Sequence, residues 1–169
     1  TVLEYDAAAG KTDPATGNTY GTSGSASLTI EAAANNVTLE NITVANSFDY
    51  PKETIEGKMA VALLTRADQL VFNNVRLTGW QDTLQADGGK RQYFKNCYIE
   101  GCVDWIFGSA QAVFDDCDIV ANRDGYVTAA STDSTRSTGY VFINSRLLKK
   151  DNSVSDNSVA LGRPWRANA

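Results

Sequence analysis

Short runs of alternating hydrophobic and polar residues recur along the chain, and each run is interrupted by an Asn or an Asp. Each copy begins with apolar residues, passes through this polar residue, and continues with alternating apolar positions. Such alternation is typical of β-strands with one buried face, and Asn and Asp tolerate the left-handed backbone of a tight bend. The repeated segment, predicted to be strand, bend and strand, occupies residues 38–44, 71–77, 93–99, 113–119 and 141–147.

The spacing of the repeated segment predicts how its strands stack. The bend residues, which are 33, 22, 20 and 28 positions apart, are Asn41, Asn74, Asn96, Asp116 and Asn144. A unit of about 20 to 22 residues fits one coil of a β-solenoid, and the 3.6-residue period of helical repeats is missing. The longer intervals contain polar insertions at residues 47–58 and 131–139, and residues 6–27 and 149–158 are expected to form further loops. We therefore predict an all-β fold, a parallel β-helix.

The composition narrows the chemistry that such a fold can perform. The chain has 169 residues, of which 43% are hydrophobic and 21% charged, so it is long enough for one domain with a real core. It contains no histidine, which excludes Ser-His-Asp and Cys-His machinery and His-ligated zinc or haem. Carboxylates are then the first choice for proton transfer. The net charge of −5 argues against a nucleic-acid partner, and no apolar run is long enough to predict a membrane span.

The three cysteines are interpreted as packing residues. The chain has three cysteines, Cys97, Cys102 and Cys117. No two of them form a CxxC pair, and three are too few for a disulfide scaffold. Cys97 and Cys117 each follow a bend residue directly, in adjacent coils, which favours small buried side chains. A redox or metal role is the alternative, and the sequence does not fix their redox state.

Two aspartates occupy the same point of adjacent coils. Asp82 lies eight residues after Asn74, and Asp104 lies eight residues after Asn96, so the two are one coil of 22 residues apart. Because neighbouring strands lie about 4.8 Å apart, their carboxyl groups should lie side by side. Like charges so close resist ionising together, so one pKa rises and the pair divides into an acid and a base or nucleophile.

A non-catalytic interpretation of this pair stays open at this point. Stacked acidic residues can be solvated, or can bind calcium. Asp49 and Asp124 also fall eight residues after a bend residue, so the offset is not unique. The aromatic residues Trp80, Trp105 and Phe107 flank the suspected pair, and a solvated face has no need of them.

Five short motifs occur in the order seen in pectin methylesterases, and the chain resembles this family. The motifs are Ala-Val-Ala-Leu at 60–63, Gln-Asp-Thr-Leu at 81–84, Val-Asp-Trp-Ile-Phe-Gly at 103–108, Tyr-Val-Thr-Ala at 126–129 and Leu-Gly-Arg-Pro-Trp at 161–165. Residues 21–25 resemble the bacterial form of the family's early substrate-side segment. The family's domain continues on both sides, so residues 1–169 are expected to be a single partial domain, without the terminal coils.

The resemblance implies a right-handed parallel β-helix that removes methyl esters from pectin without a metal or cofactor. It implies that Asp104 is the nucleophile that forms an acyl-enzyme. Asp82 protonates the leaving methanol and then acts as base for the hydrolytic water. Gln81 donates to the oxyanion, and Arg163 holds Asp104 ionised and oriented.

The resemblance also implies which residues bind the substrate. Trp165 is expected to stack against a sugar ring, Phe107 and Thr22 to line the groove, and Arg163 to contribute to binding as well as to catalysis. At position 59 the family usually has Gln, whereas this chain has Met59. A thioether offers no donor, so weaker activity is expected.

The resemblance points to one partner, methylated homogalacturonan, and to a secreted monomer, because the substrate is a cell-wall polymer. Two alternatives are a β-helical pectin lyase or hydrolase, and a non-catalytic or decayed solenoid that binds pectin. Methanol release without chain cleavage would separate the esterase from both.

Overall fold

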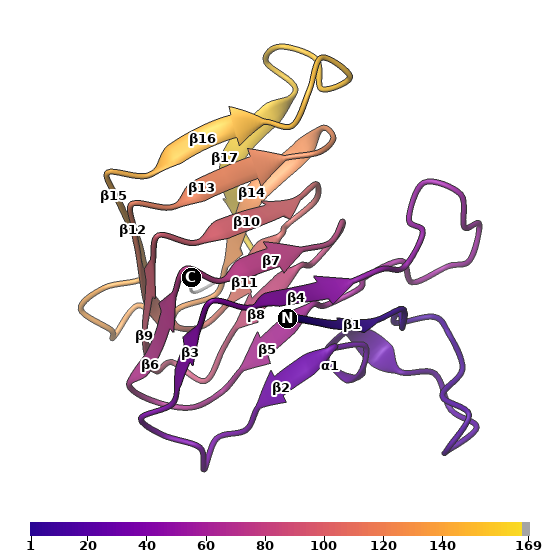
Figure 1. Ribbon diagram of the computed structural model, residues 1–169, viewed down its shortest axis with the longest axis horizontal. Coiled ribbons are helices and arrows are strands. Elements are labelled where there is room, and N and C mark those ends of the chain that lie inside the picture. Colours follow the sequence, from indigo (N-terminus) through magenta and orange to yellow (C-terminus); the bar gives the residue numbers. More distant parts are fainter. Residues whose placement is uncertain (167–169) are drawn as a thin grey trace.

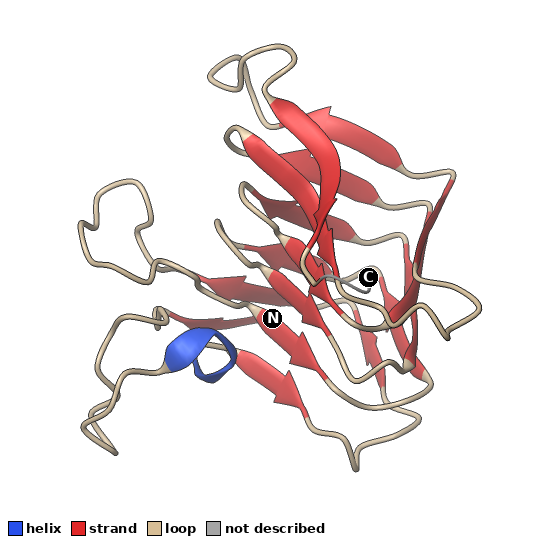
Figure 2. Cartoon of the chain, turned by 180° about the vertical axis from the view of Figure 1, so that it is seen from behind, coloured by secondary structure: helices blue, strands red, loops and turns tan. Residues whose placement is uncertain are grey.

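The computed structural model describes residues 1–166, and most of its regular structure consists of short parallel strands. The strands form three sheets around a common interior, and successive coils stack along the molecule (Figure 1). The predicted architecture, a right-handed parallel β-helix, is confirmed. The same stacking is visible from behind, where α1 (Gly21–Gly24) lies beside the first coils (Figure 2).

Each complete coil contributes one strand to each sheet, and all neighbouring strands pair in parallel. Sheet 1 contains β1 (Val2–Tyr5), β4 (Thr43–Asn46), β7 (Arg76–Thr78), β10 (Tyr98–Gly101), β13 (Asp118–Ala121) and β16 (Arg146–Lys149). Sheet 2 contains β2 (Leu28–Ile30), β5 (Leu63–Thr65), β8 (Leu84–Ala86), β11 (Ile106–Gly108), β14 (Gly125–Ala130) and β17 (Val159–Pro164). Sheet 3 contains β3 (Thr38–Glu40), β6 (Leu70–Asn73), β9 (Arg91–Lys95), β12 (Gln111–Asp115) and β15 (Tyr140–Ile143).

The bend residues turn the chain from sheet 3 into sheet 1. All five have positive φ angles, which are 55°, 53°, 52°, 53° and 51° for Asn41, Asn74, Asn96, Asp116 and Asn144. Asn and Asp side chains accept this left-handed backbone at low cost. Asn74 Nδ2 also donates to Asn41 Oδ1 at 2.8 Å, one coil away. The predicted ladder of strand, bend and strand is therefore confirmed.

Side chains of equivalent position stack inside the coils. The rings of Phe72, Phe94, Phe114 and Phe142 follow one another with centroid separations of 4.4, 4.8 and 4.8 Å and nearly parallel planes. The first three rings are completely buried, and each large buried side chain stabilises the fold by about 1.5–3 kcal/mol. The coils are thus held together by contacts between neighbours.

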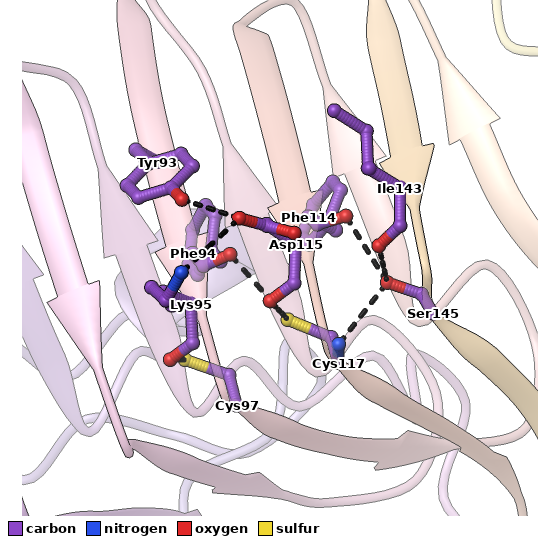
Figure 3. A network of polar contacts seen from close by, with 9 residues as sticks. All are labelled: Tyr93, Phe94, Lys95, Cys97, Phe114, Asp115, Cys117, Ile143 and Ser145. Carbon is purple, nitrogen blue, oxygen red and sulfur yellow. Dashed lines mark hydrogen bonds and ion pairs between the residues drawn. The ribbon is translucent and has the colours of Figure 1, made fainter.

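The cysteines pack as predicted. Cys97, Cys102 and Cys117 are buried free thiols. Cys117 Sγ donates to the carbonyl oxygen of Phe94 at 3.5 Å, and the Ser145 hydroxyl donates to the corresponding carbonyl one coil later at 3.0 Å (Figure 3). In the last three bends the next residue is therefore a small donor that joins one coil to the preceding one, whereas Ile42 and Val75 occupy this position in the first two.

Two of the loops meet beside the first coils of sheet 2. The predicted loops at 6–27 and 47–58 are confirmed, except that α1 interrupts the first, and 131–139 and 149–158 also lie almost entirely outside strands. The Ala9 amide donates to the Met59 carbonyl at 2.8 Å, and the Gly10 amide to the Gly57 carbonyl at 2.8 Å. These bonds join the two loops next to Met59. Over residues 1–166, no helix has the length and apolar character needed to cross a membrane.

Candidate active site

Asp82 and Asp104 lie at the same point of successive coils, in the loops that lead from sheet 1 into sheet 2. Leu84 of β8 pairs with Ile106 of β11, so the two aspartates, each two residues earlier, oppose one another. The backbone amide of Asp104 in turn donates to the carbonyl of Tyr126 at 2.8 Å. The predicted register of the pair is confirmed.

The other two aspartates with the same offset lie elsewhere. Tyr126, not Asp124, follows Asp104 in the next coil, because that coil is two residues longer between its bend and this point. Asp124 is exposed, and Asp49 lies within the inserted loop at 47–58. The number of residues from the bend matches the spatial register in the coils of Asp82 and Asp104 and fails in those of Asp49 and Asp124.

Both aspartates adopt a left-handed backbone, with φ of +67° for Asp82 and +52° for Asp104. Few residue types other than Gly, Asn and Asp tolerate this conformation. It turns the chain sharply into sheet 2 and leaves the two carboxyl groups on the outer side of that sheet.

Of the three flanking aromatic residues, one lines the cleft. Phe107 faces outwards and is 2% exposed. Trp105 is buried in the interior core, and the Trp80 ring stacks on Tyr50 with centroids 6.0 Å apart. The expectation that all three surround the carboxyl groups is wrong for Trp80 and Trp105. Neither residue lies in a strand, so the strand alternation that turns Ile106 inwards and Phe107 outwards does not extend to them.

Arg163 of β17 binds Asp104 with two parallel hydrogen bonds. Arg163 lies opposite Ala129, which lies opposite Phe107, so Arg163 reaches back over two coils. Its Nε donates to Asp104 Oδ1 at 2.9 Å, and its Nη2 donates to Asp104 Oδ2. The Asp104 side chain is 6% exposed. Two-pronged pairing of this kind fixes the orientation of the Asp104 side chain.

Asp82 has a different electrostatic environment. It is 7% exposed, and within residues 1–166 no side chain donates a hydrogen bond to its carboxyl group. Burial and the negative charge of Asp104 raise the pKa of Asp82 to about 8, and Arg163 acts weakly in the opposite direction. A neutral carboxylic acid therefore lies beside an ion-paired carboxylate below that pH.

A cleft of about 190 Å³ contains every residue that the sequence predicted for the site. It is lined by Thr22, Met59, Gln81, Asp82, Asp104, Phe107, Ala129, Arg163 and Trp165. Ala129 was missed as a site residue, although it closes the Tyr-Val-Thr-Ala motif. Among residues 1–166 no group of three or more His, Cys, Asp and Glu side chains is arranged to hold a metal ion.

Several polar residues that the sequence did not single out hold Thr22 in place. The Ser23 hydroxyl donates to Gln85 Oε1 at 3.0 Å, which ties α1 to β8. Ser25 Oγ donates to the Thr22 carbonyl at 2.6 Å and accepts from the Val61 amide at 3.1 Å. Contacts between residues so far apart in sequence leave no periodic signal that could have revealed them.

The chain is similar to known pectinesterases over most of its length. The family described as Pectinesterase matches residues 8–169. A probable pectinesterase A of Aspergillus flavus is 43% identical over 141 residues, which cover 83% of this chain and 41% of that protein.

Solved structures give the same result. The pectin methylesterase from Yersinia enterocolitica is 45% identical with a TM-score of 0.91, covering 98% of this chain and 56% of that one. A pectin methylesterase in complex with hexasaccharide VII is 36% identical with a TM-score of 0.91, covering 98% and 53%. The chain thus spans about half the length, or less, of these proteins.

Proposed function

The chain belongs to the pectinesterase family, and we propose that it hydrolyses the methyl esters of pectin, a methylated homogalacturonan, to pectate and methanol. The observation that carries the proposal is the juxtaposition of Asp82 and Asp104 in one cleft, with Arg163 bound to Asp104 alone. One carboxyl group is thereby suited to attack and the other to donate a proton, and no histidine is needed.

In the first half of the reaction, a carboxylate oxygen of Asp104 attacks the ester carbonyl carbon and forms a tetrahedral intermediate. Gln81 lines the cleft beside the two aspartates, and its amide donates to the developing oxyanion. The intermediate collapses by breaking the bond to the methoxy oxygen. Asp82 protonates this oxygen, so methanol leaves and an acyl-enzyme on Asp104 remains.

In the second half, Asp82 is a carboxylate and takes a proton from water. The water oxygen attacks the acyl carbon, and the bond to Asp104 breaks. The product is a free uronate carboxyl group, Asp104 is again a carboxylate bound by Arg163, and Asp82 is again protonated. Both aspartates therefore return to their starting forms within one cycle.

The aromatic side of the cleft is suited to a sugar ring. The rings of Phe107 and Trp165 meet edge to face with centroids 5.5 Å apart, and Trp165 is 41% exposed. We assign stacking on a substrate sugar to Trp165, and contacts at the groove wall to Phe107 and Thr22. Met59 also lines the cleft, but its thioether donates no hydrogen bond. Gln81 alone therefore supplies an amide donor to the oxyanion.

We extend the proposal to the setting of the reaction. The substrate is a cell-wall polymer, so the protein is proposed to be secreted and to act outside the cell. It is proposed to act as a monomer, since all residues assigned to the reaction lie on one chain.

The test is methanol release from highly methylated pectin by the wild type, Asp104→Ala and Asp124→Ala. Asp124 lies eight residues after its bend residue, as Asp104 does, but it is exposed and lies outside the cleft. It is therefore a matched control. We expect release that is lost in Asp104→Ala and kept in Asp124→Ala. Equal release by the two variants would refute the assigned nucleophile. Binding of pectin without any release would favour the non-catalytic solenoid, and shortening of the polymer would favour a lyase or hydrolase.

A further inference from the structure

Tyr126 belongs to the coil that lies between those of Asp104 and Arg163. Ile106 of β11 pairs with Thr128 of β14. Tyr126 and Asp104, each two residues earlier, therefore occupy equivalent positions in successive coils. Arg163 lies on β17, which pairs with β14 on the side away from β11. The Arg163 side chain therefore passes over the coil of Tyr126 to reach Asp104.

Tyr126 contacts both members of this ion pair. Its carbonyl oxygen accepts a hydrogen bond from the Asp104 amide at 2.8 Å. Its ring lies against the other member, with Arg163 Cζ 5.6 Å from the ring centroid. A guanidinium within about 6 Å of a ring centroid is attracted by the negative face of the ring, and arginine can stack on a ring while it binds a carboxylate. One residue thus holds the nucleophile by its backbone and the arginine by its side chain.

The guanidinium needs this support because it is partly exposed. The Arg163 side chain is 44% exposed, whereas that of Asp104 is 6% exposed. A long exposed side chain has many rotamers and loses conformational entropy when it is fixed in one of them. Asp104 takes two of its five N–H donors, and within residues 1–166 no other side chain accepts a hydrogen bond from it. The Tyr126 ring supplies a second contact that restricts the guanidinium.

The same stacking occurs once more on sheet 1, which separates the ring from the hydroxyl. Arg76 Cζ lies 3.8 Å from the centroid of the Tyr98 ring, and the Tyr98 hydroxyl donates to Glu100 Oε2 at 2.6 Å. The Tyr126 hydroxyl, in contrast, forms no hydrogen bond with the residues that the structure describes. The ring is therefore the part of the Tyr126 side chain that can act on the pair.

We propose that Tyr126 is a positioning residue of the reaction, whose ring holds the Arg163 guanidinium in its two-pronged pairing with Asp104. This role rests on the proposed function, because that proposal makes Asp104 the nucleophile. Tyr126 is not among the residues that line the cleft, so it acts through Arg163. Without the ring, the guanidinium samples other rotamers, and Asp104 is correctly oriented for attack during a smaller share of the time.

The first test measures kcat and KM for methanol release from methylated pectin. Tyr126→Leu removes the ring, so kcat should fall about fivefold, the usual size of such a contact at a partly exposed site, and KM should change less than twofold. Tyr126→Phe keeps the ring and should stay within twofold of the wild type in kcat. Tyr98→Leu, the matched control, removes the ring stacked on Arg76 and should change neither constant more than twofold.

The second test does not depend on catalysis. It measures, by NMR, how fast the Nε proton of Arg163 exchanges with water, because this proton lies in the hydrogen bond to Asp104 Oδ1. The signal is assigned by its loss in Arg163→Lys. Tyr126→Leu should exchange the proton several-fold faster than the wild type, whereas Tyr126→Phe and Tyr98→Leu should not.

Two kinetic results would overturn the positioning role. Equal losses of kcat in Tyr126→Leu and Tyr126→Phe would assign the effect to the hydroxyl, and a raised KM with unchanged kcat would make Tyr126 a contact for the polymer. Methanol release by the wild type, with no effect of Tyr126→Leu on kcat or proton exchange, would refute the role and leave the esterase. Faster exchange in Tyr126→Leu without methanol release by the wild type would refute the esterase and confirm only that the ring holds Arg163.

Discussion

The loops that carry Asp82 and Asp104 occupy equivalent positions in two successive coils, yet their carboxyl groups are chemically different. Both residues have left-handed backbones, both lie two residues before the first residue of a sheet 2 strand, and both are buried. Arg163 pairs with Asp104 and not with Asp82. Asp82 is instead buried beside the negative charge of Asp104, and both effects raise its pKa. The repeat thus supplies two equal positions, and one side chain two coils away makes them unequal.

The electrostatics of this solenoid site therefore do not follow its repeat. Backbone hydrogen bonds and core stacking are the same from coil to coil, because every coil meets a similar neighbour. A carboxyl group on the outer side of a sheet instead depends on the few long side chains that reach it. The pairing of Arg163 with Asp104 is therefore the first feature to test.

The largest effect is expected from Asp82→Asn. The substitution nearly keeps the shape of a neutral carboxylic acid but removes the proton that it donates. Methanol release should fall about a thousandfold, within the usual range for loss of a general acid. The initial rate on methylated pectin measures this effect, and a variant that keeps more than a tenth of the wild-type rate would mean that the two positions do not differ as described.

Replacing the guanidinium should have the next largest effect. Arg163→Lys keeps the charge but loses the two-pronged pairing with Asp104, so the nucleophile is less well oriented. We expect methanol release to fall about a hundredfold. Arg146→Lys is the matched control, because Arg146 binds Asp118 in the same two-pronged manner, at 2.7 and 2.7 Å, on sheet 1. Similar losses in both variants would indicate a general effect on the fold.

The pH dependence separates the two carboxyl groups directly. Asp82 must be protonated to donate, and its pKa is raised to about 8. Above that pH, kcat/KM should fall by about tenfold for each unit of pH. A rate that stays level to pH 10, after correction for alkaline hydrolysis of the ester, would contradict the role of Asp82 as acid.

The same pKa has a consequence for stability with a defined sign. An unfolded Asp loses its proton near pH 4, whereas folded Asp82 keeps its proton up to about pH 8. Between these values the unfolded state binds fewer protons, so stability falls as pH rises, and the contribution is constant outside this window. The melting temperature of Asp82→Asn relative to wild type should rise from pH 4 to pH 8, while that of Asp124→Asn should not change in this manner.

The smallest effect is expected at Met59, which lies in the coil before Asp82. Met59→Gln adds a second amide to the cleft and should increase methanol release several-fold, since a donor to the oxyanion stabilises the transition state. Met59→Leu, which adds no donor, is the control. No gain in the glutamine variant would show that Gln81 suffices.

Much of the fold and the core of the site follow from periodicity in the sequence. The bend residues and the stacked Phe72, Phe94 and Phe114 recur at coil spacing, so the solenoid and the register of Asp82 with Asp104 could be predicted. Counting residues from the bend gives the wrong register at Asp124, because that coil is two residues longer. Only the strand pairing reveals where the extra residues lie.

The rest depends on contacts that no period encodes. Trp80 and Trp105 flank the aspartates in sequence but point elsewhere, because the left-handed backbone resets the alternation of side chains. The roles of Arg163, Gln81 and Thr22 came from the resemblance of motifs, and the residues that support Thr22, such as Gln85, came from the structure alone.

The equivalence of the bends also governs how such a chain can grow in evolution. Duplication of one coil would preserve every strand pairing, since each bend and each core position would find an identical neighbour. Between Asp82 and Asp104, however, such an event would move the carboxyl groups from one strand spacing to about 9.6 Å apart, too far for their charges to influence one another strongly. The contacts of Asp104 with Asp82 and with Arg163 therefore require that no coil be added between Asp82 and Arg163, whereas a coil added outside this segment would leave both contacts intact.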